Sequence, residues 1–464
     1  MWSDEFRRRC LVREIRYAAL IVAIWAGLVV SARADNAASA GAAGDGALKP
    51  GVTLDKSNWQ LAEGLLPPEI LKHYREGDYV NPIVDWPDGA VKWDADFLAA
   101  TEKNAGQLDV NDVGTIVYKG TDKQPPYIFG FPFPVIDPAD PKAGVKILWN
   151  HYYGNWYIGG NTHTQVALNW IRPDGLDRTA GQDVNFLRYD GQPDRYRMDN
   201  PQNFNMQFLA NAMSPTDLYG TASLTWRYRD SDKRDSNWVY VPALRRVRAV
   251  SPANRSDGFL GSDMSQDDGP FFDGKPEDFI WKLVGEKEQL RIADPLSLQG
   301  KSTSVWLPGG GWRARWPEDV KSLGYLDPNW KGYGWAPISG GLAKRKFWVI
   351  EGVPKDKYYL YGKIELYIDK ENYQGAWNRK FSWSGELLNT LQVMGFLQHE
   401  FTRPDGTKER VQGSNMAYQC AENIKMNRAT TGGTLAPLKD PAVDVRVPYE
   451  ASFFDMNTLS RFGK

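Results

Sequence analysis

The chain has 464 residues and a formal net charge of −1, and aromatic residues make up 13% of it, including 19 Trp. A near-neutral charge gives no general attraction to nucleic acid or to anionic membranes, so we expect no nucleic-acid partner. Large flat side chains in an otherwise polar chain favour an antiparallel sheet or a lined cavity.

The N-terminus has the pattern of a secretory signal peptide, which we place at residues 1–34. Clustered arginines precede the apolar run 17–30 (YAALIVAIWAGLVV), which is short for a membrane span. Ala32-Arg33-Ala34 supplies a small-x-small cleavage pattern. We therefore expect export to the periplasm and removal of the signal, with an uncleaved anchor helix as the alternative. Cys420 would then be the one remaining cysteine, which rules out an internal disulfide.

Two segments follow before the main domain. Residues 35–52 are rich in Ala and Gly and predict a flexible lead. Residues 53–113 predict a helical cover segment with two short helices, one in LLPPEILKHYREG and one in DADFLAATEKNAG. The first should begin at the prolines and end at Gly77, and the second should begin at Asp94 or Asp96 and end at Gly106.

Residues 114–464 predict a curved antiparallel β domain, because period-two patterns recur between turn residues without helices between them. The fold class is mainly β (α+β), a large curved antiparallel sheet or half-barrel covered by short helices. Pro-Asp-Gly at 173–175 and 404–406 fits tight reversals. The Trp, Gly and Pro-rich segment 295–341 predicts a long ordered loop, and FFDMNTLSRFGK a short C-terminal helix capped by Asp455 or Asn457. The strands are expected in TIVYKG, GVKILWNHYY, TQVALNWIRPDG, TASLTWRYR, NWVYVPALRRVRAV, KFWVIEG, YYLYGKIELYID, RKFSWSG and LLNTLQVM.

Catalytic and cofactor motifs are missing from the sequence. It contains no G-x-S-x-G, H-E-x-x-H, C-x-x-C or G-x-x-x-x-G-K-[ST] pattern, so no catalytic residue is assigned and no cofactor is expected. Asp263, Asp267, Asp268 and Asp273 are weak candidates for a calcium site through oxygen ligands. Their spacing does not match an EF-hand, and ion pairs with Arg245, Arg246, Arg248 or Arg255 are the simpler reading.

The excess of Trp and Tyr has three interpretations: core packing, sugar stacking and the wall of an apolar cavity. The sequence does not decide between them. Cavity-wall residues, on the third interpretation, are expected at Trp149, Tyr152, Trp156, Trp226, Trp238 and Tyr240.

Ser236–Val250 predicts one strand of a hairpin whose other arm is TASLTWRYR, with Pro242 at an edge or bulge. Arg246 and Arg248 share one face of that strand and could bind a carboxylate or phosphate head group at a cavity rim. The following stretch, SPANRSDGFLGSDMSQDD, has the turn residues of a loop.

These residues carry a resemblance. The runs WVYVPALRRVR and SDGFLGSDMSQDD are similar to the central motif of the LolA-like outer-membrane lipoprotein-sorting protein superfamily. More broadly, NWQLAEGLLPPEILKHYREGDY, FGFPFPVIDPADPKAGVKILWN, FFDGKPEDFIWKLVGEKE and FDMNTLSRFGK resemble the family called domain of unknown function 1329. The superfamily implies a half-barrel with helices over its open side and an apolar cavity for acyl chains.

The leading functional hypothesis is therefore a non-enzymatic periplasmic carrier or chaperone for a lipid, a lipoprotein acyl chain or another hydrophobic molecule. Its partner could be a transport protein of the inner or outer membrane. One alternative is a periplasmic hydrolase or lyase acting on a polysaccharide or an aromatic compound with the acidic loop. The other is an adaptor docking on a membrane pump.

Overall fold

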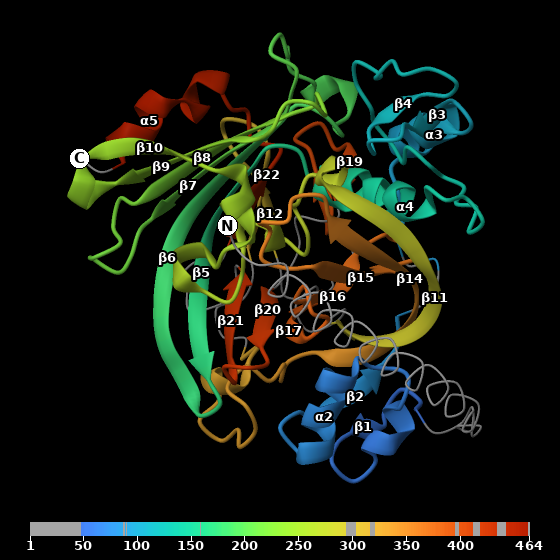
Figure 1. Cartoon of the computed structure of the whole chain (residues 1–464), viewed down its shortest axis with the longest axis vertical. Coiled ribbons are helices and arrows are strands. Elements are labelled where there is room, and N and C mark those ends of the chain that lie inside the picture. The colour runs from blue at the N-terminus through green and yellow to red at the C-terminus, as the bar shows by residue number, and fades with distance from the viewer. Residues whose placement is uncertain are drawn as a thin grey trace, which may run out of the picture. The chain divides into compact units, whose positions relative to one another are not determined.

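The computed structural model describes residues 48–462 except 87–88, 90, 158, 294–302, 316–320, 395–398, 412–417 and 434–441 (Figure 1). The predicted signal peptide and the lead up to Ala47 lie outside the described residues. The chain from Leu48 onward is one compact unit. None of the described helices has the length and apolar character needed to cross a membrane.

The unit is mainly β, as predicted, and is built on a mixed, mostly antiparallel sheet of 18 strands that is not closed into a barrel. Figure 1 shows β5 and β6 curving along one side and β11 and β14 along the other. The main antiparallel path runs β10 (Arg246–Val250), β9 (Ser236–Val241), β8 (Ala222–Tyr228), β7 (Phe204–Ala212), β6 (Gly175–Arg188), β5 (Thr162–Arg172), β21 (Arg428–Gly433), β20 (Tyr418–Asn423), β17 (Leu387–Val393), β16 (Gly375–Phe381), β15 (Lys363–Asp369), β14 (Gly341–Pro354) and β11 (Phe279–Ala293).

Shorter strands extend this sheet or pair separately. The N-terminal half of β5 pairs with β22, which continues the sheet to a hairpin, and β14 also pairs in parallel with β2. Two further hairpins stand outside the large sheet. The bounds are β1 (Thr53–Leu54), β2 (Asn81–Val84), β3 (Leu108–Val110), β4 (Ile116–Tyr118), β12 (Thr303–Trp306), β13 (Trp312–Arg315), β18 (His399–Thr402), β19 (Lys408–Val411) and β22 (Ala442–Val445).

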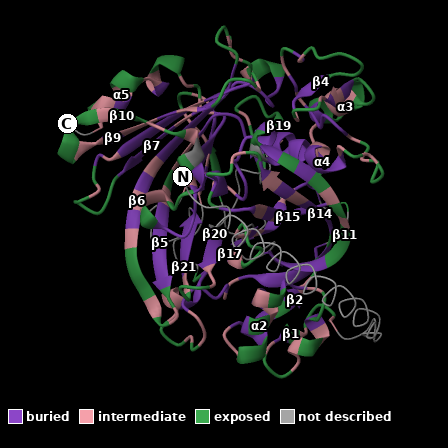
Figure 2. Cartoon of the chain, viewed as in Figure 1, coloured by how far each residue is buried: buried purple, intermediate pink, exposed green. Residues whose placement is uncertain are grey.

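The two faces of the sheet bury different cores. On β14, Trp348 and Ile350 belong to an inner cluster, while Phe347 and Val349 belong to an outer one, because successive side chains alternate across a strand. Figure 2 shows buried residues along most of β5, β20 and β21. The inner face is the one that holds the candidate site.

Four short α-helices of the described residues pack on both faces of the sheet. Helices α3 (Ala95–Asn104) and α4 (Ala143–His151) contribute to the inner cluster. Helix α2 (Pro68–Glu76) packs into the outer cluster behind β14, and α5 (Met456–Arg461) packs into a third cluster behind β7, β8 and β9. The short helices that the resemblance implied are therefore present, and they pack on both faces of the sheet.

The predicted starts and ends of the helices are confirmed. Helix α2 has proline in its first turn and ends at Gly77, which adopts the left-handed conformation with φ 88°. Helix α3 follows Asp94, although the Asp94 carboxylate accepts a hydrogen bond from the Arg410 N–H instead of capping its own helix. Helix α5 begins after Asp455, whose carboxylate accepts a hydrogen bond from the Thr458 N–H at 2.7 Å. The Pro-Asp-Gly reversals join β5 to β6 and β18 to β19.

One strand prediction was wrong. GVKILWNHYY forms α4 and the π-helical turn η2 (Tyr152–Trp156). Nearly every residue of α4 is buried, and a helix that is apolar on all sides shows no 3.6-residue stripe. A short apolar run of this kind reads equally as a buried strand, and that ambiguity caused the error.

Two other predictions need correction. Ser236–Val250 is not one strand, because the 3₁₀ turn η4 (Pro242–Leu244) and Arg245, with φ 48°, reverse the chain so that β9 pairs with β10. Proline has no N–H to continue a ladder, which places the turn there. The predicted loop 295–341 contains β12 and β13 within its described part, and β13 joins the sheet through β22. Strands of four residues were too short to show periodicity.

Candidate functional site

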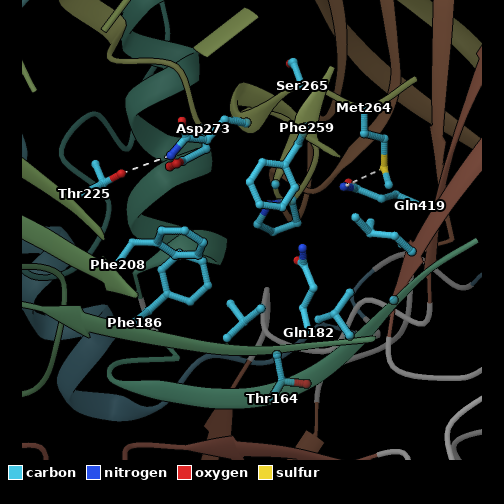
Figure 3. A pocket seen from close by; sticks show the side chains of 18 of the residues that line it. Thr164, Gln182, Phe186, Phe208, Thr225, Phe259, Met264, Ser265, Asp273 and Gln419 are labelled. Carbon is cyan, nitrogen blue, oxygen red and sulfur yellow. Dashed lines mark hydrogen bonds between the residues drawn. The ribbon is translucent and has the colours of Figure 1, made fainter. Parts of the chain in front are cut away.

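A hollow lies on the inner face of the sheet, against β5, β6, β7 and β8 (Figure 3). It contains about 1170 Å³ of space between its atoms, its open mouth included. Most of the lining surface is apolar, which is typical of pockets that bind small hydrophobic molecules.

The strands supply its wall through alternate residues that face inward. β5 contributes Val166 and Leu168, and β6 contributes Val184 and Phe186. The Phe186 and Phe208 rings pack together with centroids 4.8 Å apart. The strand residues in the wall are Thr162, Thr164, Val166, Leu168, Gln182, Val184, Phe186, Met206, Phe208, Thr225, Gln419, Gly432, Gly433 and Val443.

Residues 251–278, here called the crossing loop, close the hollow from the inside. Phe259 and Met264 of this loop face the wall, and Figure 3 shows Phe259 opposite Phe186 and Phe208. The loop reaches both halves of the sheet: Gln266 donates a hydrogen bond to Thr225 Oγ1 on β8, and Gln419 on β20 donates to the Asp268 carbonyl. The S-D-G-F-L-G-S-D-M motif is therefore a lining of the hollow.

Buried ion pairs hold the crossing loop in place. Arg255 Nε lies 2.6 Å from Asp267 Oδ1, and its Nη2 lies 3.2 Å from Asp273 Oδ2. Arg227 on β8 pairs with Asp273 and with Asp235 at 3.1 and 3.0 Å. Burial opposes ionisation of Asp235, but Arg227 and Arg255 hold the pKa of that carboxyl below its ordinary value. The loop is thus fastened to the sheet by charges that water does not screen.

Two other aspartates of the loop pair with different cations. Asp268 pairs with Lys380 at 2.6 Å, with both side chains buried, and Asp263 pairs with Arg428 at 3.0 Å. The four calcium candidates are therefore divided among four separate cations, Arg227, Arg255, Lys380 and Arg428. No group of acidic, His or Cys residues in the described chain has the arrangement of a metal site. The predicted ion pairing is confirmed for Arg255.

The predicted cavity residues on the first aromatic run lie elsewhere. Trp149 on α4 donates its indole N–H to the Gly114 carbonyl, and Tyr152 on η2 donates its hydroxyl to the Gly274 carbonyl. Both are buried in the inner cluster but outside the lining of the hollow. The side chain of Trp156 lies outside the described residues.

The predicted aromatic residues on the hairpin pack on the opposite side of the sheet, although Trp238 also borders a second pocket on the β8 and β9 side. Trp226 and Trp238 have ring centroids 4.8 Å apart and pack with Tyr240 in the cluster beneath α5. The Trp226 indole N–H donates to the Phe454 carbonyl. Arg246 and Arg248 are exposed on the edge strand β10 and do not belong to the lining of the hollow.

The lining residues of β6 and β7 were missed in the sequence, although the sequence contains a signal for them. Gln182, Val184 and Phe186 alternate within GQDVNFLR, and Met206 and Phe208 alternate within FNMQFLANA. Neither segment had been assigned as a strand. The period-two pattern would have identified both.

Comparison with known proteins places the chain in a family. A family model described as protein of unknown function (DUF1329) matches residues 53–459. The chain belongs to the DUF1329 family. This confirms the family resemblance found in the sequence.

Individual similarities to this DUF1329 protein are distant. An uncharacterized protein of Pseudomonas aeruginosa is 22% identical over 273 residues, which cover 56% of this chain and 52% of that protein, so the match spans about half of the relative's length. A solved domain from Vibrio parahaemolyticus, provisionally named an outer membrane lipoprotein-sorting protein, is 16% identical with a TM-score of 0.44, covering 69% of this chain and 100% of that one. A solved DUF1329 family protein from Desulfovibrio piger is 16% identical with a TM-score of 0.43, covering 70% of this chain and 99% of that one.

Proposed function

We propose that this DUF1329 protein is a periplasmic carrier that shields a hydrophobic molecule, such as a lipid acyl chain, in the hollow under its sheet. The observation that carries the proposal is the continuous apolar lining formed by inward residues of β5, β6 and β7 together with Phe259 and Met264 of the crossing loop. Export to the periplasm rests on the signal pattern in residues 1–34 and remains a prediction.

The energetics support reversible binding. Transfer of a methylene group from water into an apolar site contributes about 0.8 kcal/mol. Ten methylenes would contribute roughly 8 kcal/mol before the cost of immobilising the ligand, which leaves a micromolar or weaker complex. Such affinity suits a protein that must also release its cargo.

The polar groups beside the hollow favour a carrier over the hydrolase or lyase alternative. A glycoside hydrolase needs two carboxyl groups flanking its substrate. Among the described lining residues the acidic one is Asp273, and its carboxylate is already bound by Arg227 and Arg255. Transfer to or from a membrane transport protein remains a prediction from the sequence.

The direct experiment has two steps. Protein purified from its native compartment is extracted with organic solvent, and the extract is identified by mass spectrometry. The delipidated protein is then mixed with fatty acids, phospholipids and monoacylglycerols, and complexes are counted by native mass spectrometry. We expect uptake of one acyl compound per chain, and a protein that takes up none of them would sink the proposal.

A variant links uptake to this hollow. Val184→Trp fills the space next to Phe186 and should abolish uptake. Because Val184 is buried in the inner cluster, circular dichroism must show that the variant is folded. Val305→Trp is the matched control, since Val305 lies on β12 outside the lining with 44% of its surface exposed. Equal uptake by both variants would place the ligand elsewhere.

A further inference from the structure

A second pocket adjoins the hollow on the β8 and β9 side. It contains about 870 Å³ of space between its atoms, open mouth included, and shares Gln182, Thr225, Phe259 and Gln266 with the lining of the hollow. The two spaces therefore meet at the same four side chains. A ligand that occupies both spaces must pass between these four side chains.

Two polar side chains in this second pocket are buried without a hydrogen-bond partner. Asn237 is 7% exposed and Ser223 is 8% exposed, and neither the Asn237 amide nor the Ser223 hydroxyl has a partner. Asn237 stands opposite Thr225 in the β8–β9 ladder, and Ser223 is two residues from Thr225, so all three side chains face the same side of the sheet. That side is the one on which Thr225 lines the hollow.

Unpaired polar groups at this depth point to a ligand that pairs with them. A buried donor or acceptor left without a partner costs about 1–3 kcal/mol, and most such groups in proteins are satisfied. Asn237 offers a donor and an acceptor, and Ser223 offers a hydroxyl that can serve as either. The Thr225 hydroxyl oxygen already accepts a hydrogen bond from the Gln266 side-chain amide at 3.0 Å, and this bond orients the Gln266 amide.

The charged residues around the two pockets indicate whether the ligand's head group is charged or neutral. Among the described lining residues the cation is Arg255, which is bound to Asp267 and Asp273. The second pocket has amides and hydroxyls, and its acidic residue is the exposed Asp257. A phosphate or carboxylate placed there would lose its hydration without gaining a counter-charge, whereas hydroxyls and amides would be paired.

We propose that the second pocket binds an uncharged head group carrying hydroxyl or amide groups, while the attached acyl chain occupies the hollow. The ligand class is thus a neutral amphiphile such as a monoacylglycerol. This inference rests on the proposed carrier function and deepens it. It also replaces the expectation that Arg246 and Arg248 receive an anionic head group, because both are exposed on β10 and neither lines the pocket.

The test compares ligands that share one chain and differ in head group. Delipidated protein is titrated with monoolein, with oleate at a pH where it is ionised, and with the matching long-chain hydrocarbon. We expect monoolein to bind at least about tenfold more tightly than oleate. Asn237→Leu should weaken monoolein binding roughly 5- to 30-fold and change hydrocarbon binding by less than about twofold, since it removes hydrogen bonds and keeps the side-chain volume.

Two further variants keep the result interpretable. Ser223→Ala removes one hydroxyl with little risk to folding and should weaken monoolein binding by about threefold to tenfold, which serves if Asn237→Leu does not fold. Asn329→Leu, at an exposed loop position, is the matched control and should change nothing.

The outcomes separate the two proposals. Binding of none of the three probes would overturn the carrier function itself. Oleate binding as tight as monoolein binding would overturn the neutral head group and leave the carrier standing. An equal loss for all probes in Asn237→Leu and Ser223→Ala would show that these residues only support the fold, and would also overturn the inference.

Discussion

Arg255 and Asp267 form a buried ion pair within the crossing loop, with 2.6 Å between Nε and Oδ1, and each side chain is no more than 6% exposed. Tyr359 donates its hydroxyl to the other oxygen of Asp267 at 2.8 Å. The loop that lines the hollow is therefore held by charge-assisted hydrogen bonds as well as by apolar packing. Its shape should depend on that pair.

Removal of the cation should destabilise the protein strongly. Arg255→Met leaves Asp267 and Asp273 buried with one cation fewer, and breaking a buried pair in this way costs about 3–5 kcal/mol. The free energy of unfolding, measured with urea, checks the prediction. Arg234→Met is the matched control: its pair with Asp356 is at the surface, with side chains 57% and 30% exposed, and should be worth less than about 1 kcal/mol. Similar losses in both variants would contradict it.

The sequence predicted the local features of the fold well. Proline at the start of α2, Gly77 at its end and Asp455 before α5 each act over a few residues, so one sequence is enough to read them. The sequence of α4 is buried on all sides and contains no local signal that distinguishes a helix from a strand. The prediction of a strand there was wrong for that reason.

The candidate site was less predictable, because its key relationships are long-range. Asp263 and Arg428 are 165 residues apart in the chain, and the sequence offers no way to pair them. The motif after Val250 was recognised, but the adjoining strand was expected to form the cavity wall. In the structure β9 and β10 lie outside the lining of the hollow and border the second pocket, and the crossing loop lines the hollow instead. The turn at Pro242 reverses the chain, so the single strand that was predicted is in fact the hairpin of β9 and β10.

Stability should fall as His163 loses its proton. His163 on β5 lies between Asp183 and Asp444, at 2.8 and 3.2 Å, and hydrogen bonds to both carboxylates raise its pKa to about 9. The folded pKa lies above the unfolded value of about 6.5, so the stabilisation is complete below that pH and is lost as the pH rises through 9. With the imidazole 29% exposed, we expect a contribution of roughly 1–3 kcal/mol.

The check is urea unfolding of the wild type and of His163→Gln across this pH range. The wild type should lose stability between pH 6.5 and 9 relative to the variant, whose glutamine does not titrate. Parallel curves for the two proteins would contradict the prediction. An NMR titration of the imidazole would give the folded pKa independently.

Truncation on opposite faces of the sheet should separate stability from binding. Phe454→Ala removes a fully buried ring from the cluster beneath α5 on the outer face, and should cost about 3–5 kcal/mol without changing ligand uptake. Met206→Ala enlarges the hollow on the inner face, and should cost about 2–5 kcal/mol and also alter the affinity for acyl compounds. Calorimetry and native mass spectrometry measure the two effects. Loss of uptake in Phe454→Ala would return Trp226 to the list of cavity residues.

Cys420 should report on global unfolding. Its thiol is 4% exposed in the outer cluster, and burial, together with the nearby carboxylates of Glu422 and Asp263, raises its pKa well above the ordinary range. The thiolate is the reactive form, so a thiol reagent should modify Cys420 only when the sheet opens. In a Cys10→Ser variant the labelling rate at neutral pH should therefore be slow and should rise with denaturant in step with unfolding measured by circular dichroism. If labelling in native buffer were as fast as that of a free thiol, β20 would be opening locally, which would contradict the burial of Cys420 in the outer cluster.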